Sequence, residues 1–455
     1  GAIGIAMDSE ADALLGEGLN SGDDIVLYKA RYVQLVLFCL VSITNATLWI
    51  TFAPIVDSVE DYYGVEAFGV NVLSLVFMAA YIPMVFPAGW VLDGLPRQYG
   101  IPFGGLRWGM LLAAVGSALG ACVRVIPPYW GCLTGQTIAA IAQPFVLNAP
   151  PMLAANWFPK EQRTMATTIC SVANPVGVAM GFVLPPILVQ DDDLLPLLLV
   201  EAGIAVVVAL LAVLLIREKP PTPPSISAAN EVRDEKMLTS LAKLAKDVNF
   251  WLLFLSFGFG LGSFNTLATL INQIVAPEQY SDTQSGVLGA MVVFAGLVGS
   301  GIAGAVVDKF HWYKGVLIVS FTLATLSTAL FTLVLQEDQF WLVFIACTLI
   351  GLTMMPLLPI SLELAVEITY PMREAMPSGL LMVQGQVVGI ILIVVMSALL
   401  NNEYTAPSWV LDNVHAACWI VVACTLISLL LMLMFRGKLK RGTEEAKGKV
   451  VDINS

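Results

Sequence analysis

The hydrophobic residues of this chain fall into long, nearly uninterrupted stretches that are separated by short polar segments. Each stretch has about the 20 apolar residues that a helix needs to cross a bilayer. We therefore predict an all-α membrane protein with twelve transmembrane helices, near residues 33–56, 70–92, 103–125, 130–155, 164–189, 194–216, 249–275, 284–307, 315–336, 340–366, 376–400 and 415–435.

The pattern repeats in two halves. Gly89 and Asp93 close the second predicted helix, and Gly304 and Asp308 close the eighth at the same spacing. A six-plus-six repeat with a long central connection is typical of the major facilitator superfamily fold, whose site lies near the midplane between the halves. Residues 1–32 are predicted to form a disordered acidic tail, with a cloning remnant before Met7. The two six-helix halves are predicted over 33–216 and 249–435, and a linker with an amphipathic helix over 217–248 joins them. Residues 436–455 form a second tail, predicted to be cytoplasmic.

Lys and Arg residues occupy only alternate connections. Of the 22 in the chain, all except Arg124 lie in the tails or in connections on the same side as the tails. Because cytoplasmic loops retain Lys and Arg, we expect both termini in the cytoplasm of a multi-pass membrane protein. We expect the plasma membrane as its location, with an endolysosomal membrane as the alternative. Arg124 is expected to snorkel outward or to pair with an outer acid.

Composition narrows the class of function. The chain is 58% hydrophobic and 12% charged, whereas a soluble domain has about 25% charged residues. It has no basic, aromatic-interleaved surface of the kind that binds nucleic acid. It also has no hydrolase, zinc-protease or nucleotide-binding motif, and its seven Cys lack metal-ligand spacing. We therefore expect no enzymatic activity, no cofactor and no metal site.

Polar side chains inside the predicted helices are the candidates for solute binding, because polar groups avoid lipid. Asn45 and Trp49 lie four residues apart and share one helix face. Packing or a position at the membrane interface is the alternative for Trp49. Gln143 and Asn174 lie in the fourth and fifth helices, where hydrogen bonding between helices or helix bending is the alternative role.

Charged residues at the inner helix ends are predicted to act in gating. The two Gly-x-x-x-Asp turns match the inner-loop motif of major facilitators, and two glutamates of the tenth helix are expected to pair with Arg373 or another inner cation. The gating candidates are Asp93, Arg97, Asp308, Lys309, Glu363 and Glu367.

Glu201 lies within the sixth predicted helix. A carboxylate in a membrane span is a functional hypothesis by default, so Glu201 is a candidate for proton coupling, with a structural role as the alternative.

Several strings resemble the FLVCR-like solute carriers, named for the feline leukaemia virus subgroup C receptor. They are Asn45 to Pro54, Tyr81 to Pro83, Trp157 to Pro159, Ala173 to Pro175 and Glu363 to Glu367. The resemblance covers nearly all twelve helices and is closest to the "major facilitator domain-containing 7" branch. It implies a transporter, in a family whose members are described as carriers of haem, of choline or ethanolamine, or of pyridoxine.

The same resemblance implies roles for individual residues. In the choline-type members an aromatic box and two glutamines surround the ammonium group; Trp49 matches one ring, and Gln143 and Gln386 match the glutamines. Asn265, which follows Phe264, stands where those members have a tyrosine. Because a well-placed ring contributes ~0.5–2 kcal/mol to cation binding, this difference weakens or redirects selectivity for choline.

We therefore predict a secondary transporter, facilitative or ion-coupled, that moves a small organic solute by alternating access. A choline-like or ethanolamine-like amine is the first substrate class, and haem or a pyridoxine-like vitamin is the alternative, although the predicted cavity has no His to ligate haem. A receptor or scaffold without transport is a third hypothesis, which the short outer loops disfavour. The expected partners are the small-molecule substrate and the lipid bilayer, with the chain acting as a monomer.

Overall fold

The structure is a computed structural model that describes residues 28–94, 103–159, 162–190, 192–221, 244–369, 375–401 and 413–437. In this part of the chain, 11 helices are long and apolar enough to cross a membrane, and one bent helix pair brings the number to 12. The predicted all-α membrane fold is confirmed.

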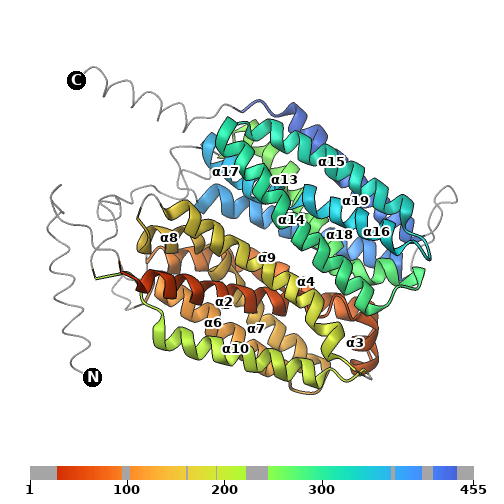
Figure 1. Cartoon of the computed structure of the whole chain (residues 1–455), viewed down its shortest axis with the longest axis horizontal. Coiled ribbons are helices and arrows are strands. Elements are labelled where there is room, and N and C mark those ends of the chain that lie inside the picture. Colours follow the sequence, from red (N-terminus) through yellow and green to blue (C-terminus); the bar gives the residue numbers. More distant parts are fainter. Residues whose placement is uncertain are drawn as a thin grey trace.

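The helices form two halves that lie side by side (Figure 1). The first half contains α2 (Ala30–Ile50), α3 (Val56–Tyr63), α4 (Ala67–Leu92), α6 (Leu106–Arg124), α7 (Tyr129–Leu147), α8 (Pro150–Trp157), α9 (Arg163–Leu188) and α10 (Leu195–Leu215). The second contains α13 (Val248–Val275), the short η2 (Ala276–Glu278), α14 (Asp282–Phe310), α15 (Tyr313–Val334), α16 (Phe340–Met354), α17 (Leu357–Thr369), α18 (Ala375–Leu400) and α19 (Asn413–Met434).

The helices run between two ends of the bundle. We call the end where α2 begins and α19 ends the terminal end, and the opposite end, which carries α3, the far end (Figure 1). The charge pattern predicts that the terminal end is cytoplasmic. The amphipathic helix predicted within 217–248 falls largely on residues 222–243, which lie outside the described residues.

Proline breaks three of the predicted spans. The first span was expected to continue to residue 56, but α2 ends at Ile50 and a turn through Pro54 leads into α3. Proline has no N–H to donate and clashes with the preceding turn of a helix. Pro150 follows a 48° bend between α7 and α8, and Pro356 lies in the break between α16 and α17.

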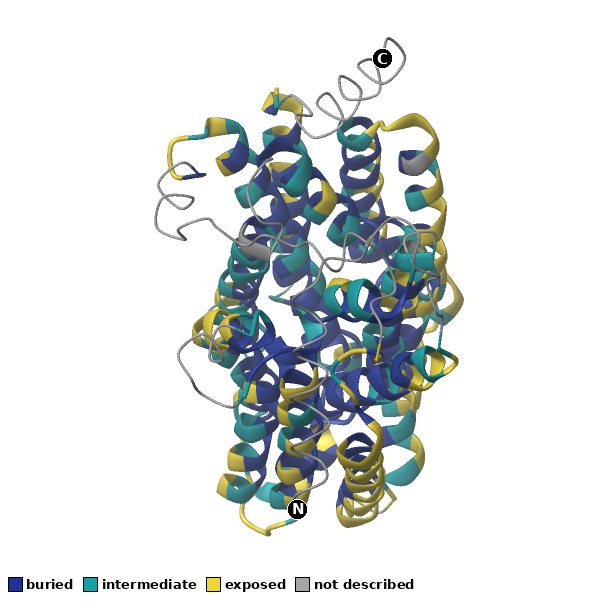
Figure 2. Cartoon of the chain, turned by 90° about the vertical axis from the view of Figure 1, so that its left-hand side faces the viewer, coloured by how far each residue is buried: buried dark blue, intermediate teal, exposed yellow. Residues whose placement is uncertain are grey.

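Small residues face the bundle and large apolar residues face outward, as expected for helices in lipid. In α10 the alanines Ala205 and Ala212 are buried, whereas Val207, Leu210 and Leu214 are exposed. Figure 2 shows the same distribution over the whole bundle, with buried positions inside and exposed positions outside.

The two halves meet along two helix pairs, α4 with α18 and α9 with α14. On α18, Gly389 provides the space next to Met78 of α4. On α14, Gly286 and Gly289 provide the space for Phe182 of α9. These glycines let helices from opposite halves approach closely, which is how small residues act in membrane helix packing.

Candidate functional site

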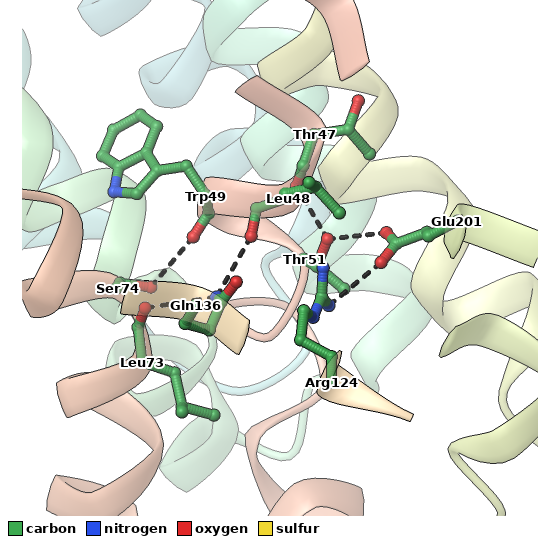
Figure 3. Close-up of polar contacts among 9 residues, drawn as sticks. All are labelled: Thr47, Leu48, Trp49, Thr51, Leu73, Ser74, Arg124, Gln136 and Glu201. Carbon is green, nitrogen blue, oxygen red and sulfur yellow. Dashed lines mark hydrogen bonds and ion pairs between the residues drawn. The ribbon is translucent and has the colours of Figure 1, made fainter. Parts of the chain in front are cut away.

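Trp49 lies in the last turn of α2, just before the helix breaks. Its side chain is almost buried, at 8% exposure, and its Nε1 has no hydrogen-bond partner in the described part of the chain. Its carbonyl accepts a hydrogen bond from Ser74 Oγ of α4 at 3.3 Å. Figure 3 shows the indole projecting away from this backbone contact. The ring therefore offers an unused N–H and an aromatic surface.

Asn265 and Gln386 form a pair between α13 and α18. Asn265 Nδ2 donates to Gln386 Oε1 at 3.3 Å, and the two residues are 5% and 6% exposed. Gly389, three residues after Gln386, lies against Asn265 of α13 and Met78 of α4. The amide pair thus belongs to the second half and lies close to the first.

Helix α4 shows that these predicted site residues lie at similar depths in the bundle. Ser74, which contacts Trp49, and Met78, which contacts Gly389, are four residues apart and lie on one face of the helix. Trp49 and the Asn265–Gln386 pair are therefore separated by about one helical turn along α4. We call this level of the bundle the central zone.

Gln143 lies in α7, nearer the terminal end than Trp49. In the same helix, Gln136 Nε2 donates to the carbonyls of Leu48 at 3.1 Å and Leu73 at 3.2 Å, which places Gln136 at the level of Trp49. Gln143 follows Gln136 by two turns, about 10 Å nearer the terminal end. Its side chain is buried, and it makes no hydrogen bond with the other described residues.

Asn45 is used in helix packing in this structure. It is fully buried, and its Nδ2 donates to Ser117 Oγ of α6 at 2.9 Å and to the Ala139 carbonyl of α7 at 3.0 Å. These hydrogen bonds show a packing role for Asn45 in this structure, and its role in solute binding stays a prediction.

Asn174 and Phe264 come from α9 and α13, and their roles in solute binding stay predictions. Asn174 is half-buried in α9. Phe264 points into an apolar cavity of about 20 Å³, whose lining includes Phe182 and Val293. That volume suits about one water molecule, so Phe264 is not adjacent to a solute-sized space here.

The gating candidates lie at the terminal end. Asp93 follows α4, Lys309 lies near the end of α14 with its Nζ 5.3 Å from the Phe310 ring centroid, and Glu363 and Glu367 lie in α17. Arg97, Arg373 and the side chain of Asp308 are outside the described residues. The gating roles therefore remain predictions.

At the far end, hydrogen bonds join the two halves. Asn71 of α4 donates to Ser397 Oγ of α18 at 3.0 Å, and it exchanges hydrogen bonds with Gln273 of α13 at 2.7 and 3.2 Å. Gln273 is a polar residue within the seventh predicted span, so its sequence position marks it as a candidate for a buried polar contact. Asn71 and Ser397 carried a weaker signal, because single polar residues near a helix end are common.

A second contact between the halves is made by Asn272. Its Nδ2 lies 3.0 Å from the carbonyl of Pro54, 2.8 Å from Asp282 Oδ1 and 3.1 Å from Ser285 Oγ. Pro54 belongs to the first half, and the other two acceptors belong to the start of α14. We call this contact and the Asn71 hydrogen bonds the far-end latch.

Arg124 and Glu201 form a buried ion pair. Arg124 Nη2 lies 3.0 Å from Glu201 Oε2, with side-chain exposures of 0% and 3%. Glu201 Oε1 accepts a hydrogen bond from Thr51 Oγ1 at 2.7 Å (Figure 3). The outer acid expected to meet Arg124 is thus Glu201, and the proton-coupling candidate is held by a cation.

Comparison with known proteins agrees with this architecture. The profile of the Major Facilitator Superfamily matches residues 38–392 and 262–452. The chain is 36% identical over 383 residues to solute carrier family 49 member A3 of Xenopus tropicalis, covering 82% of this chain and 78% of that protein. It is 30% identical over 440 residues to the choline/ethanolamine transporter FLVCR2 of Homo sapiens, covering 93% and 81%.

Solved structures show the same fold. The D-xylose-proton symporter superposes with a TM-score of 0.67 at 14% identity, covering 90% of this chain and 98% of that one. A bacterial homologue of the human lysosomal transporter Spinster, inward-facing and occupied, gives a TM-score of 0.63 at 13% identity, covering 90% and 97%.

Proposed function

Because this chain belongs to the major facilitator superfamily and, within it, to the FLVCR-like solute carriers, it is a membrane transporter, and we propose that it carries a small organic amine of the choline or ethanolamine type. The observation that supports this most is the position of Trp49. Trp49 is nearly buried, and its depth in the bundle differs from that of the Asn265–Gln386 pair by about one helical turn along α4.

The central zone suits a small cation with a polar end. An aromatic face attracts an ammonium group, and amides both donate and accept hydrogen bonds. In this proposal Trp49 holds the ammonium group, while Gln143 and Gln386 orient the hydroxyl. Alternating access would come from rocking the halves, which opens the far-end latch and closes the terminal end by means of the predicted gating residues.

We propose that both termini face the cytoplasm, because Lys and Arg collect at the terminal end. The far end, where the latch closes, then faces outward. The plasma membrane and a monomeric transporter are the simplest arrangement consistent with this orientation.

Uptake of radiolabelled choline and ethanolamine by cells expressing the protein tests the proposal. We expect saturable uptake. Trp49→Ala should raise the KM for uptake by ~3- to 30-fold, because cation–π contacts contribute ~0.5–2 kcal/mol. Trp49→Phe keeps an aromatic ring and should raise the KM less. Trp341→Ala is the matched control, since Trp341 is 73% exposed on α16. Absence of amine uptake, with uptake of haem or pyridoxine instead, would reject the amine class.

A further inference from the structure

We infer that Arg124 and Glu201 are positioning residues that hold the break of α2 in the shape required to close the far end. The inference rests on the proposed alternating access. It assigns these two buried charges a role in the equilibrium between open and closed states, separate from solute binding.

The ion pair and its hydrogen bond to Thr51 connect three helices of the first half at the break of α2. Arg124 is the last residue of α6, Glu201 lies in α10, and Thr51 is the first residue after α2. Glu201 uses one oxygen for Arg124 at 3.0 Å and the other for the Thr51 hydroxyl at 2.7 Å. One carboxylate therefore connects the end of α6 to the break.

The guanidinium group also contacts the break directly. Arg124 Cζ lies 4.7 Å from the centroid of the Phe52 ring, within the range of a cation–π contact. Gly135 of α7 has no side chain where Arg124 passes: a methyl group there would lie 2.6 Å from Arg124 Cγ. The packing thus leaves Arg124 a defined place over Phe52.

The break carries the acceptor of the far-end latch. Two residues beyond Phe52, the carbonyl of Pro54 accepts a hydrogen bond from Asn272 of the second half at 3.0 Å. On that side Asp282 and Ser285 hold the Asn272 amide, at 2.8 and 3.1 Å. Both the donor and the acceptor of the latch are therefore held in place by groups of their own half.

This arrangement explains why a charged pair is present in a part of the first half that does not contact solute. At the break, Thr51 N still donates to the Thr47 carbonyl at 3.1 Å, whereas Ala53 N donates to the Ile50 carbonyl at 2.9 Å, one residue short of the α-helical pattern. A turn that leaves the helical pattern in this way has several conformations of similar energy. Fixing Thr51 and Phe52 selects the conformation in which the Pro54 carbonyl faces Asn272. Without the pair, the first half still folds around its apolar core, but the latch loses its oriented acceptor.

A reporter cysteine can measure the closed state without any substrate. Thr269 lies on α13 between Asn265 and Asn272, is buried, and its hydroxyl has no hydrogen-bond partner among the described residues. Thr269→Cys therefore removes no hydrogen bond within the described residues. Cys122, which is exposed, is replaced by Ser. Because Cys132 lies beside Arg124, every variant is also labelled without Thr269→Cys, and the difference in labelling by a membrane-impermeant thiol reagent added from outside reports on Thr269→Cys.

The variants separate positioning from stability. Glu201→Gln and Arg124→Met each remove one charge, and the double variant Arg124→Met/Glu201→Met removes both. Replacement of a buried ion pair by apolar side chains is often neutral or stabilising, so the double variant should unfold thermally at or above the temperature of the parent. Asp57→Asn is the matched control, because it removes an exposed acid from the same end.

We expect the double variant to label about threefold to tenfold faster than the parent, the change expected when a latch hydrogen bond is lost. Asp57→Asn should label at the parental rate. A folded double variant that labels at the parental rate would overturn the inference. Because labelling needs no solute, failure of amine uptake alone would overturn the proposed function and leave this inference intact.

Discussion

We propose that solute selectivity depends on the amide side chains of the second half. Asn265 donates to Gln386 Oε1 at 3.3 Å, so the oxygen of Gln386 is partly used and its NH₂ group is directed elsewhere. A quaternary ammonium group binds best to aromatic faces, whereas a primary ammonium group needs hydrogen-bond acceptors. An amide at position 265 therefore favours ethanolamine over choline.

Asn265→Tyr should reverse this preference. The added ring supplies a cation–π contact of ~0.5–2 kcal/mol, so we expect the ratio of choline to ethanolamine uptake to rise by ~3- to 30-fold. Competition of the two solutes in one uptake assay measures the ratio, and Trp341→Ala on α16, whose side chain is exposed, serves as the comparison. An unchanged ratio would show that position 265 does not face the solute.

The roles of single residues were only partly predictable. Asn45 and Trp49 share a helix face by their spacing, but Asn45 donates to Ser117 and Ala139. Spacing fixes which side of a helix a residue occupies and does not fix which neighbour covers that side. For the same reason the sequence raised the question of Arg124 but could not identify Glu201 as its partner.

The packing of α9 on α14 limits how closely the two halves approach at the far end. A methyl group added at Gly289 would lie 2.5 Å from Phe182 Cδ1, and the Phe182 side chain is buried. Gly301, farther along the same helix, is exposed and has nothing within 4 Å of an added methyl group. The same substitution should therefore act differently at these two positions.

Gly289→Ala should destabilise the closed far end by ~1–3 kcal/mol, the usual cost of overpacking. We expect at least about a fivefold rise in labelling of Thr269→Cys by an impermeant reagent. Gly301→Ala should leave labelling unchanged, since Ala favours a helix by ~1 kcal/mol in both states. Equal labelling of the two variants would argue against closure through α9 and α14.

Hydropathy predicted the spans well and their interruptions poorly. Apolar runs extend through Pro54, Asn148 and Pro356 without a change in hydropathy, so each span was expected to be continuous. The breaks arise because proline cannot complete the backbone hydrogen bonds, and neighbouring helices compensate for the freed groups. Those neighbours are not visible in a local sequence pattern.

The whole molecule is electrically polarised from end to end. The order of charged connections predicts from the sequence which end is cytoplasmic, because translocation acts on loops and not on tertiary contacts. At the far end, α3 and its flank carry Asp57, Glu60, Asp61 and Glu66. Burial, followed by the negative charges of Asp57, Asp61 and Glu66, raises the pKa of Glu60 above 4.5.

This acidic end should concentrate cations at the mouth of the transporter. We expect Glu60→Gln combined with Asp61→Asn to lower the initial rate of choline uptake about twofold at low ionic strength and to have little effect at high salt. As pH falls, Glu60 gains its proton before an ordinary glutamate does, so uptake should decline earlier in the parent than in Glu60→Gln. A rate independent of salt would contradict this prediction.

Gln136 has a mechanical consequence. It holds the carbonyls of Leu48 and Leu73 at once and so ties together α2, α4 and α7, the helices that carry Trp49 and Gln143; we expect these helices to move as one body in alternating access. Asn265 and Gln386 belong to the other body. A solute must then be long enough to touch both bodies if its binding is to drive them together. The length of the solute, in addition to its charge, decides whether it is carried or merely occupies the site.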